Sequence, residues 1–520
     1  MSEEVISADE LLLRAQGHKG ELPRQFSTLA MLSLAFSITN SWIGYSAVFI
    51  TPLLCGGGPG VFFGLLVAAV ACSLINAGLA ELASAYPSSG GQYHFAYMVS
   101  SEKHRAVAAF IMGWLSVIAW CLTTASASIF CAQMIGNLAT FFNPTYVATQ
   151  WQVYLVYVLV MILSTAIVCF LPRAIPKGEI AFFICNITAF CVFFITCLAV
   201  SHGRQSSRVV FTEYVNQTGW SNGMAFMLGV GQAMYTFVAT DAGTHMAEEL
   251  PDPGRNIPRV ILYTMIIGIV TSFLWTIAFM FSTTDLTAVS ASALPILTVY
   301  SQALNNHSAA TFFMCWYLWI YFGAVISCIA TTGRLAWAFA RDNGLPFSPT
   351  FARVNTTFAV PINATAICAV AIILYGAIYV GSTTAFNSFI SMSILSLNVT
   401  YAAPQGILLL RGRSLLPSTR HFSLGPVFGP LCNAFSVAWV SLYTVLFCFP
   451  VFTPTTPQTM NYVSVVVAGI VAIVAGAWFG GKRKSFVGPE IHIEGIEEAL
   501  AMRGGEGLDV ERKGNMGLAK

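Results

Sequence analysis

An apolar run between residues 221 and 259 is interrupted in its middle by small and polar residues. It reads SNGMAFMLGVGQAMYTFVATDAGTHMAEELPDPGRNIPR, and a carboxylate, Asp241, closely follows the interruption at Ala239. Hydrocarbon cannot solvate a freed backbone carbonyl or a carboxylate, so such a break is tolerated at membrane depth only where it lines a cavity. The run therefore predicts a polar site inside a membrane, with Asp241 as its first candidate residue.

The composition predicts an all-α integral membrane protein. Hydrophobic residues make up 56% of the 520 residues and charged residues only 9%, whereas soluble domains carry about 25% charge. The first 28 residues are polar and charged and contain no apolar core of a signal peptide. Twelve apolar segments follow, each close to the ~20 residues that a spanning helix needs. They are 28–54, 60–85, 106–139, 151–171, 179–202, 222–247, 259–283, 311–338, 360–380, 384–410, 427–450 and 461–480.

The placement of lysine and arginine gives the orientation of these spans. With a cytoplasmic N-terminus, 22 of the 24 basic residues fall in inner segments, and only Arg204 and Arg208 fall outside. This asymmetry is the positive-inside pattern, and it predicts that both termini are cytoplasmic. The outer loops then contain two candidate glycosylation sites, Asn216 and Asn306.

A second polar interruption lies in the first apolar segment, between Thr39 and Ser46. The breaks are five spans apart, so the two broken segments run in opposite directions. That arrangement predicts a five-plus-five inverted repeat over 28–202 and 222–410, two further helices within 427–480, and cytoplasmic tails 1–27 and 481–520. Two interrupted helices at matching positions are typical of a secondary transporter's substrate site. The candidate binding residues at the first break are Asn40, Ser41, Trp42, Gly44, Tyr45 and Ser46.

Around the second break, Phe237, Ala239, Thr240 and Asp241 are the candidates. Phe237 is either a gate over the substrate or a core residue. Three roles are open for Asp241: pairing with a substrate ammonium, accepting a proton, or holding the broken helix through backbone hydrogen bonds.

Further acidic residues could carry protons. Asp241, His245 and Glu248 are spaced i, i+4, i+7 and share a helix face, which could relay protons to the cytoplasm. The alternative is a solvated inner helix end. Glu81, at the inner end of the second span, is another proton-coupling candidate, or else a partner of an inner arginine.

An aromatic cluster occupies residues 316–322 in the eighth span. Aromatic faces bind quaternary ammonium groups, and an interfacial aromatic belt is the alternative interpretation. Tyr321 is the best candidate for the cavity. Farther along, the hydroxyls of Ser327, Thr331 and Thr332 could ligate sodium or could simply join helices.

The chain lacks the sequence patterns that are typical of several other function classes. The chain has no phosphate-binding loop, no cluster of metal ligands and no nucleophile elbow. It also lacks a basic patch on a soluble domain. We therefore expect neither an enzyme nor a nucleic-acid-binding protein, and no cofactor or metal.

Longer stretches carry a family resemblance. They are SITNSWIGYSAVF, AELASAYPSSGGQY, TDAGTHMAEELPDPGRNIPRVI, FARDNGLPFS and TTPQTMNYVSVVVAG. Together they resemble the amino acid–polyamine–organocation (APC) superfamily, and within it the fungal amino acid/choline permeases, over about residues 22 to 485. The resemblance implies a midplane site between spans 1, 3, 6, 8 and 10. It also implies a span-6 aromatic gate at Phe237 and a span-6 acidic position at Asp241.

One departure from the family concerns the substrate. The family's glycine–small–glycine motif, which cradles a substrate carboxylate, corresponds here to Gly44, Tyr45 and Ser46. A bulky tyrosine and a serine in place of a glycine favour an amine over an amino acid.

The resulting expectation is a proton-coupled importer in a lipid bilayer. Choline or a related quaternary amine is the first substrate choice, with gamma-aminobutyrate or another amino acid as the alternative. A passive channel and a nutrient receptor are less favoured. The plasma membrane is the preferred location, with the vacuolar membrane as the alternative.

Overall fold

The structure is a computed structural model that describes residues 21–143, 145–201, 203–418, 420–457 and 459–489. Within these ranges the protein is a bundle of helices without β-strands, with one isolated bridge between Asn355 and Val360. The predicted tails 1–27 and 481–520 lie largely outside the described residues. The all-α fold predicted from the sequence is confirmed.

Ten helices in the described ranges are long and apolar enough to cross a membrane. They comprise α4 (Ile50–Ala85), α6 (Arg105–Phe142), α7 (Gln150–Phe170), α8 (Ile175–Val200, preceded by η1, Pro172–Ala174), α12 (Pro253–Ser282), α15 (His307–Arg341), α17 and α18 (Ile362–Gly376 and Ile378–Gly381), α19 (Thr383–Arg411), α20 (Gly425–Leu446), and α21 (Val463–Ala477) with η5 (Trp478–Lys482) and α22 (Arg483–Ser485). The other two predicted spans, 28–54 and 222–247, are the interrupted ones, and the interruptions leave each without a long continuous helix.

The interrupted spans consist of short pieces. The first contains α2 (Thr28–Thr39) and α3 (Ser41–Val48) and continues into the start of α4. The second contains α10 (Asn222–Ala233), η2 (Met234–Phe237), α11 (Ala242–His245) and η3 (Ala247–Glu249).

The boundary between the first two predicted spans is a sharp turn inside α4. Gly57 has φ 64° and ψ −149°, and Pro59 follows it. A Cβ atom at Gly57 would lie 3.0 Å from the carbonyl oxygen of Glu213. Glycine is required here because the backbone is left-handed and the neighbouring loop is close.

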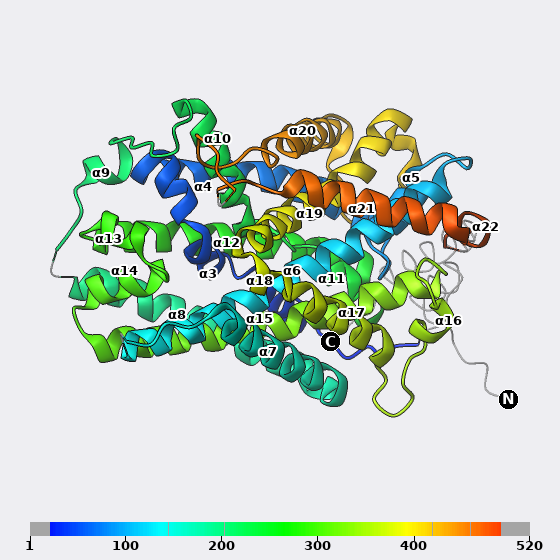
Figure 1. Ribbon diagram of the computed structural model, residues 1–520. Coiled ribbons are helices and arrows are strands. Elements are labelled where there is room, and N and C mark those ends of the chain that lie inside the picture. Colours follow the sequence, from blue (N-terminus) through cyan, green and yellow to red (C-terminus); the bar gives the residue numbers. More distant parts are fainter. Residues whose placement is uncertain (1–20, 144, 202, 419, 458, 490–520) are drawn as a thin grey trace, which may run out of the picture.

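Several short helices lie at the two ends of the bundle (Figure 1). At one end lie α9 (Ser207–Phe211), α13 (Leu286–Ala291) and α14 (Pro295–Leu304), all in loops predicted to be outer. At the other lie α5 (Gln92–Val99), α16 (Ser348–Phe351) and α22, all in segments predicted to be inner. Between the ends, α10 and α12 pack along α4, while α15 and α19 pack along α6. The interrupted segments contact each other through α3 with η2 and α2 with α11.

Candidate functional site

The first break is a single residue. Asn40 has left-handed backbone angles, φ 37° and ψ 50°, between α2 and α3. Asparagine tolerates this region better than most residues with a side chain. Its Oδ1 accepts a hydrogen bond from Nδ2 of Asn186 on α8 at 2.9 Å. The predicted interruption is confirmed, but it is narrower than 39–46, because residues 41–48 are helical.

The second break extends over several residues. η2 ends at Phe237, Val238 is extended, and Ala239 has φ 62°. A left-handed conformation costs a residue with a Cβ about 1–2 kcal/mol, so the surrounding packing must hold Ala239 in place. Thr240 Oγ1 donates a hydrogen bond to Asn76 Oδ1 on α4. The predicted interruption near Ala239 is confirmed.

A small enclosed cavity of about 20 Å³ lies between the two breaks. This volume accommodates about one water molecule, so the bundle is closed around its centre. Its lining residues are Ile38, Thr39, Asn40, Gly44, Thr123, Ala127, Tyr235, Val238, Ala239, Tyr321, Ala324 and Cys328. Within the described part of the chain, no charged side chain lines it.

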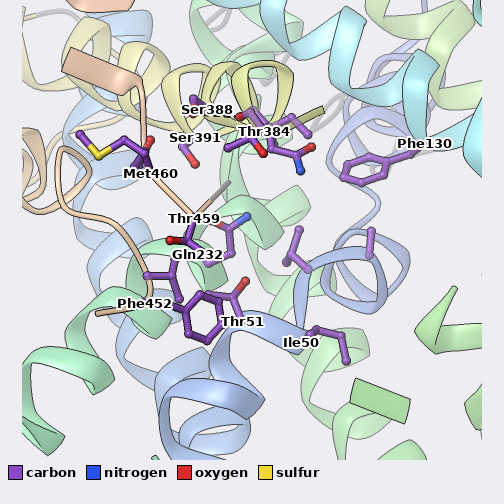
Figure 2. A pocket seen from close by; sticks show the side chains of 16 residues that line it. Ile50, Thr51, Phe130, Gln232, Thr384, Ser388, Ser391, Phe452, Thr459 and Met460 are labelled. Atoms are coloured by element: carbon purple, nitrogen blue, oxygen red, sulfur yellow. Dashed lines mark hydrogen bonds between the residues drawn. The ribbon is translucent and has the colours of Figure 1, made fainter. Parts of the chain in front are cut away.

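A larger vestibule of about 360 Å³ lies toward the end of the bundle that contains the predicted outer loops. Figure 2 shows Thr384, Ser388 and Ser391 of α19 facing Thr51 and Phe452 across it. Polar side chains from α19, Gln232 of α10 and the segment before α21 make much of its wall.

Phe130 of α6 separates the vestibule from the inner cavity. Its side chain lines the vestibule. Its ring also packs edge-on against Tyr235 and Tyr321, which line the cavity, with both centroid distances at 6.1 Å. The hydroxyls of these tyrosines are 3.5 Å apart. Three aromatic rings from α6, η2 and α15 thus form a layer over the cavity.

Asp241 is fully buried, accepts hydrogen bonds from three side chains and shares a fourth hydrogen bond with His245. Its Oδ2 receives Gln92 Nε2 at 2.7 Å and Trp120 Nε1 at 3.3 Å. The same oxygen lies 2.9 Å from His245 Nε2. Its Oδ1 receives the Tyr401 hydroxyl at 2.5 Å. The carboxylate therefore joins the second break to α5, α6 and α19, and it lies behind the cavity wall rather than in the lining.

His245 lies between Asp241 and the backbone of Ser89. Its Nε2 faces Asp241, and its Nδ1 lies 3.2 Å from the carbonyl oxygen of Ser89. Because a carbonyl only accepts, the Ser89 contact is a hydrogen bond only with a proton on Nδ1, and the contact between Nε2 and Asp241 Oδ2 then requires a second proton between these two atoms. The pair is either imidazolium with carboxylate or neutral imidazole with carboxylic acid. Both arrangements hold the same number of protons.

Two ion pairs lie next to this pair, toward the end of the bundle that is predicted to be inner. Glu248 receives both terminal nitrogens of Arg341, at 2.7 and 3.0 Å. Glu249 receives Arg334 Nε at 2.9 Å, and Gln25 Nε2 at 2.7 Å. Glu249 and Arg334 are both 1% exposed. The Ser89 hydroxyl accepts a hydrogen bond from the backbone N–H of Glu248 at 3.3 Å, so Ser89 connects the face of Asp241 and His245 to this layer.

Glu81 lies in a separate cluster with two arginines. It receives hydrogen bonds from Arg413 and Arg420, and its Oε1 also accepts the backbone N–H of Leu424 at 3.0 Å. The structure thus shows the arginine pairing that the sequence offered as one of two interpretations. Among the described residues, no group of three or more His, Cys, Asp and Glu side chains is placed to hold a metal ion.

The sequence profile of the amino acid permease family matches residues 29–473. The chain belongs to the amino acid permease family. This permease is 35% identical over 468 residues to a protein named choline transporter in Saccharomyces cerevisiae, with 89% of this chain and 82% of that one covered. It is 29% identical to a protein named swainsonine transporter swnT in Arthroderma benhamiae, with 89% and 92% covered. It is 27% identical to a protein named amino-acid permease BAT1 in Arabidopsis thaliana, with 93% and 97% covered.

These similarities establish the class of the permease. It is an integral membrane protein of the APC superfamily and a secondary transporter, and it is not an enzyme. The resemblance noted in the sequence is confirmed over most of the chain.

The structure brings four of the predicted site residues of the permease to the cavity, namely Asn40, Gly44, Ala239 and Tyr321. The others face elsewhere. Tyr45 donates to the carbonyl of Val61, and the side chain of Phe237 lies near Gly268 of α12. Ser41 Oγ also lies near Gly268.

Trp42 and Ser46 belong to a structural network in the permease. Trp42 Nε1 donates to Asn186 Oδ1 at 2.7 Å, and Ser46 Oγ accepts from Trp275 Nε1 at 2.6 Å. The Trp42 and Trp275 rings pack edge-on at 5.4 Å.

Sequence reasoning missed Phe130, Tyr235, Gln92, Trp120 and Tyr401. Tyr235 lies two residues before Phe237, and the 3-10 turn of η2 directs it to the cavity. The other four come from segments that carry no interruption. Only their three-dimensional contacts with the second break identify them.

Proposed function

We propose that this permease imports choline or a related small amine together with protons. The observation that carries the proposal is the aromatic layer of Phe130, Tyr235 and Tyr321 over a cavity whose described lining contains no charged side chain. A quaternary ammonium binds well to aromatic faces, with about 0.5–2 kcal/mol from each well-placed ring. The similarity to a protein named choline transporter supports the same substrate class.

An amino acid, including gamma-aminobutyrate, is the alternative substrate. Its carboxylate would need freed backbone amides at the first break, where Gly44 lines the cavity. The similarity to proteins named amino-acid permeases supports this alternative. Against it, the described cavity lining offers no arginine or lysine to pair with a carboxylate. Asp241 is also satisfied by its own neighbours, so recognition of the substrate cation falls to the aromatic rings.

Transport then proceeds by alternating access. Substrate enters the vestibule and passes Phe130 when its ring moves off Tyr235 and Tyr321. The inner side stays closed by the pairs Glu248–Arg341 and Glu249–Arg334 until the substrate is bound. The small cavity volume requires the lining side chains to retract around choline. In this proposal the twelve spans form a five-plus-five inverted repeat with two added helices, since the two broken segments carry the site together.

The proposed orientation places the vestibule outside and the ion pairs in the cytoplasm. It rests on the basic residues, which predict cytoplasmic termini. Asn306 is exposed and Asn216 is half-buried in the outer loops, and both remain candidate glycosylation sites. The plasma membrane is the proposed location, and the vacuolar membrane is the alternative.

Proton coupling is assigned to Asp241 and His245. Loss of the proton between them would leave two acceptor atoms facing each other at 2.9 Å, which would push the pair apart. Movement of His245 would act on Ser89 and hence on the segment that holds Glu248. Glu248 is the proposed inner continuation of the relay, whereas Glu81, within its arginine cluster, is given a structural role.

A substrate panel tests the proposal. Radiolabelled choline, ethanolamine, gamma-aminobutyrate and basic amino acids are offered to a transport-deficient yeast strain that expresses the protein. We expect saturable uptake of choline that unlabelled choline competes away. Uptake of amino acids without uptake of choline would overturn the substrate assignment.

A further inference from the structure

Glu179 of α8 is a buried carboxyl group that the proposed mechanism has not used. It is 2% exposed. Its Oε1 accepts a hydrogen bond from the Ser327 hydroxyl of α15 at 2.7 Å. Its Oε2 has no hydrogen-bond partner among the described residues. A carboxyl group at membrane depth with one unpartnered oxygen is a candidate functional group.

The surroundings of Glu179 provide hydroxyls rather than a compensating charge. The Ser37 hydroxyl of α2 faces the carboxyl, and it too lacks a described hydrogen-bond partner. The thiol of Cys328 on α15 lies close enough to interact electrostatically. A buried carboxylate without a cation is costly, whereas a protonated carboxyl can donate from Oε2 to the Ser37 oxygen.

The basic residues of the neighbouring helices are exposed or paired. Arg173 of η1 and Lys177 of α8 are exposed, and so are Arg255 and Arg259 of α12. On α15, Arg334 and Arg341 pair with Glu249 and Glu248. The sequences of α2 and α14 contain no charged residue. None of these helices therefore offers Glu179 a described ion pair.

The position of Glu179 links it to the first break and the cavity. Ser37 lies three residues before Asn40. Asn186, seven residues after Glu179 and so on a similar face of α8, holds both Asn40 and Trp42. Cys328, which lies close to Glu179, also lines the cavity. Helix α8 therefore braces the first break at two points, and one of them is the carboxyl group.

We propose that Glu179 is a second proton-binding site, protonated while the bundle is closed and deprotonated when its inner half opens. The proton bridges Oε2 and the Ser37 oxygen, so α2, α8 and α15 stay together. Water that reaches Glu179 near the inner start of α8 accepts the proton and solvates the carboxylate. The charged group then favours the open arrangement. This inference rests on the proposed proton coupling and adds a site that is independent of Asp241 and His245.

Infrared spectroscopy of the purified full-length protein tests proton binding directly. We expect wild type at neutral pH to show the carbonyl stretch of a protonated carboxyl group, and Glu179→Gln to lose that band. The control Glu213→Gln, in an exposed pair with Arg208 at 3.8 Å, keeps it. A band that is absent from wild type, or unchanged in Glu179→Gln, overturns the inference.

Transport assays in proteoliposomes separate this inference from the proposed function. With choline as the probe, Glu179→Gln should retain exchange of choline but lose the pH dependence of net uptake. Ser327→Ala, which removes only the hydroxyl donor, should shift the pH profile and keep uptake. Absence of proton-driven uptake in wild type would contradict the proposed function. If wild-type uptake is driven by protons and Glu179→Gln has the same pH profile as wild type, the Glu179 inference alone is wrong. Sodium-activated uptake that depends on Glu179 would also contradict it.

Discussion

The Tyr401 hydroxyl donates to Oδ1 of Asp241 at 2.5 Å, across 160 positions of sequence. Tyr401 lies on α19, and Asp241 follows the second helix break. The contact ties α19 to the second break, which the proposed mechanism requires to change shape. Together with Gln92, Trp120 and His245, Tyr401 surrounds the Asp241 carboxyl group with hydrogen-bond partners from four segments.

Asp241→Asn should both destabilise the protein and abolish proton-driven uptake. The side-chain amide nitrogen that replaces one carboxylate oxygen would face the hydrogen-bond donors around position 241, and His245 would lose its buried carboxylate partner. Removing one member of a buried pair costs about 3–5 kcal/mol, which thermal unfolding of the purified protein detects. The control Asp285→Asn, at an exposed cap whose carboxylate accepts the N–H of Ala288, should change stability by less than about 0.5 kcal/mol. Equal melting curves and uptake in both variants would show that Asp241 has no special role.

Phe130→Ala should weaken choline binding by removing the ring between vestibule and cavity. A desolvated cation gains about 0.5–2 kcal/mol from each well-placed ring, so we expect the apparent KM to rise about 2- to 30-fold. Phe142→Ala, at the outer end of the same helix and 61% exposed, serves as the control. Initial uptake rates over a range of choline concentrations measure the effect. An unchanged KM in Phe130→Ala would show that the Phe130 ring is not part of the gate.

Substitutions of the two cavity tyrosines distinguish choline binding by aromatic rings from choline binding by hydroxyl groups. Tyr235→Phe and Tyr321→Phe keep the aromatic face and should retain most of the choline affinity. Tyr235→Leu and Tyr321→Leu lose the face and should weaken it by about 2- to 30-fold, since a desolvated cation gains about 0.5–2 kcal/mol per ring. Tyr263→Leu, on a 50% exposed position of α12, controls for loss of a tyrosine. Competition by unlabelled choline gives the affinities. The reverse order, with phenylalanine as harmful as leucine, would indicate hydroxyl recognition.

Arg341→Met should open the inner side. The substitution removes the bidentate partner of Glu248. The Glu248 side chain is 3% exposed and would be left as an uncompensated buried charge. Cys328 lines the cavity, so a membrane-impermeant thiol reagent applied from the cytoplasmic side reports the opening. Labelling that disappears in a Cys328→Ala background identifies the residue. Arg353→Met, at an exposed inner position, should leave labelling at the wild-type level. No increase in Arg341→Met would mean that this pair does not hold the inner side closed.

Protonation of His94 should not contribute to the pH dependence of these assays. Burial, assisted by the charge of Arg341, lowers the pKa of the His94 imidazole to about 4. His94 on α5 is therefore neutral near pH 7, and a transport transition near neutral pH belongs to other groups.

Much of the fold follows from the sequence because membrane constraints are strong. Apolar length and basic residues predict the spans, and polar residues inside an apolar run predict the breaks at Asn40 and Ala239. Side-chain direction at a break does not follow, because non-helical backbone abolishes the helical period. The sequence favours Phe237 for the cavity, whereas Tyr235 lines it. The sequence also favours Tyr45, but its hydroxyl donates to the carbonyl of Val61, and the helical α3 presents Gly44 to the cavity instead.

The partners of the acidic residues could not be read from the sequence either. Asp241 is paired with His245 through local spacing, which the sequence shows. Its other donors, Gln92, Trp120 and Tyr401, lie at least 121 positions away and meet it only through the packing of α5, α6 and α19.

Choline accumulation in proteoliposomes under an imposed proton gradient tests the central claim most directly. Purified wild-type protein is reconstituted, the outside is acidified relative to the inside, and internal radiolabelled choline is followed over time in sodium-free buffer. We predict accumulation above the external concentration, collapse of that accumulation on addition of a protonophore, and no accumulation in Asp241→Asn. Equilibration of choline without accumulation, or accumulation that the protonophore leaves intact, would contradict proton-coupled import.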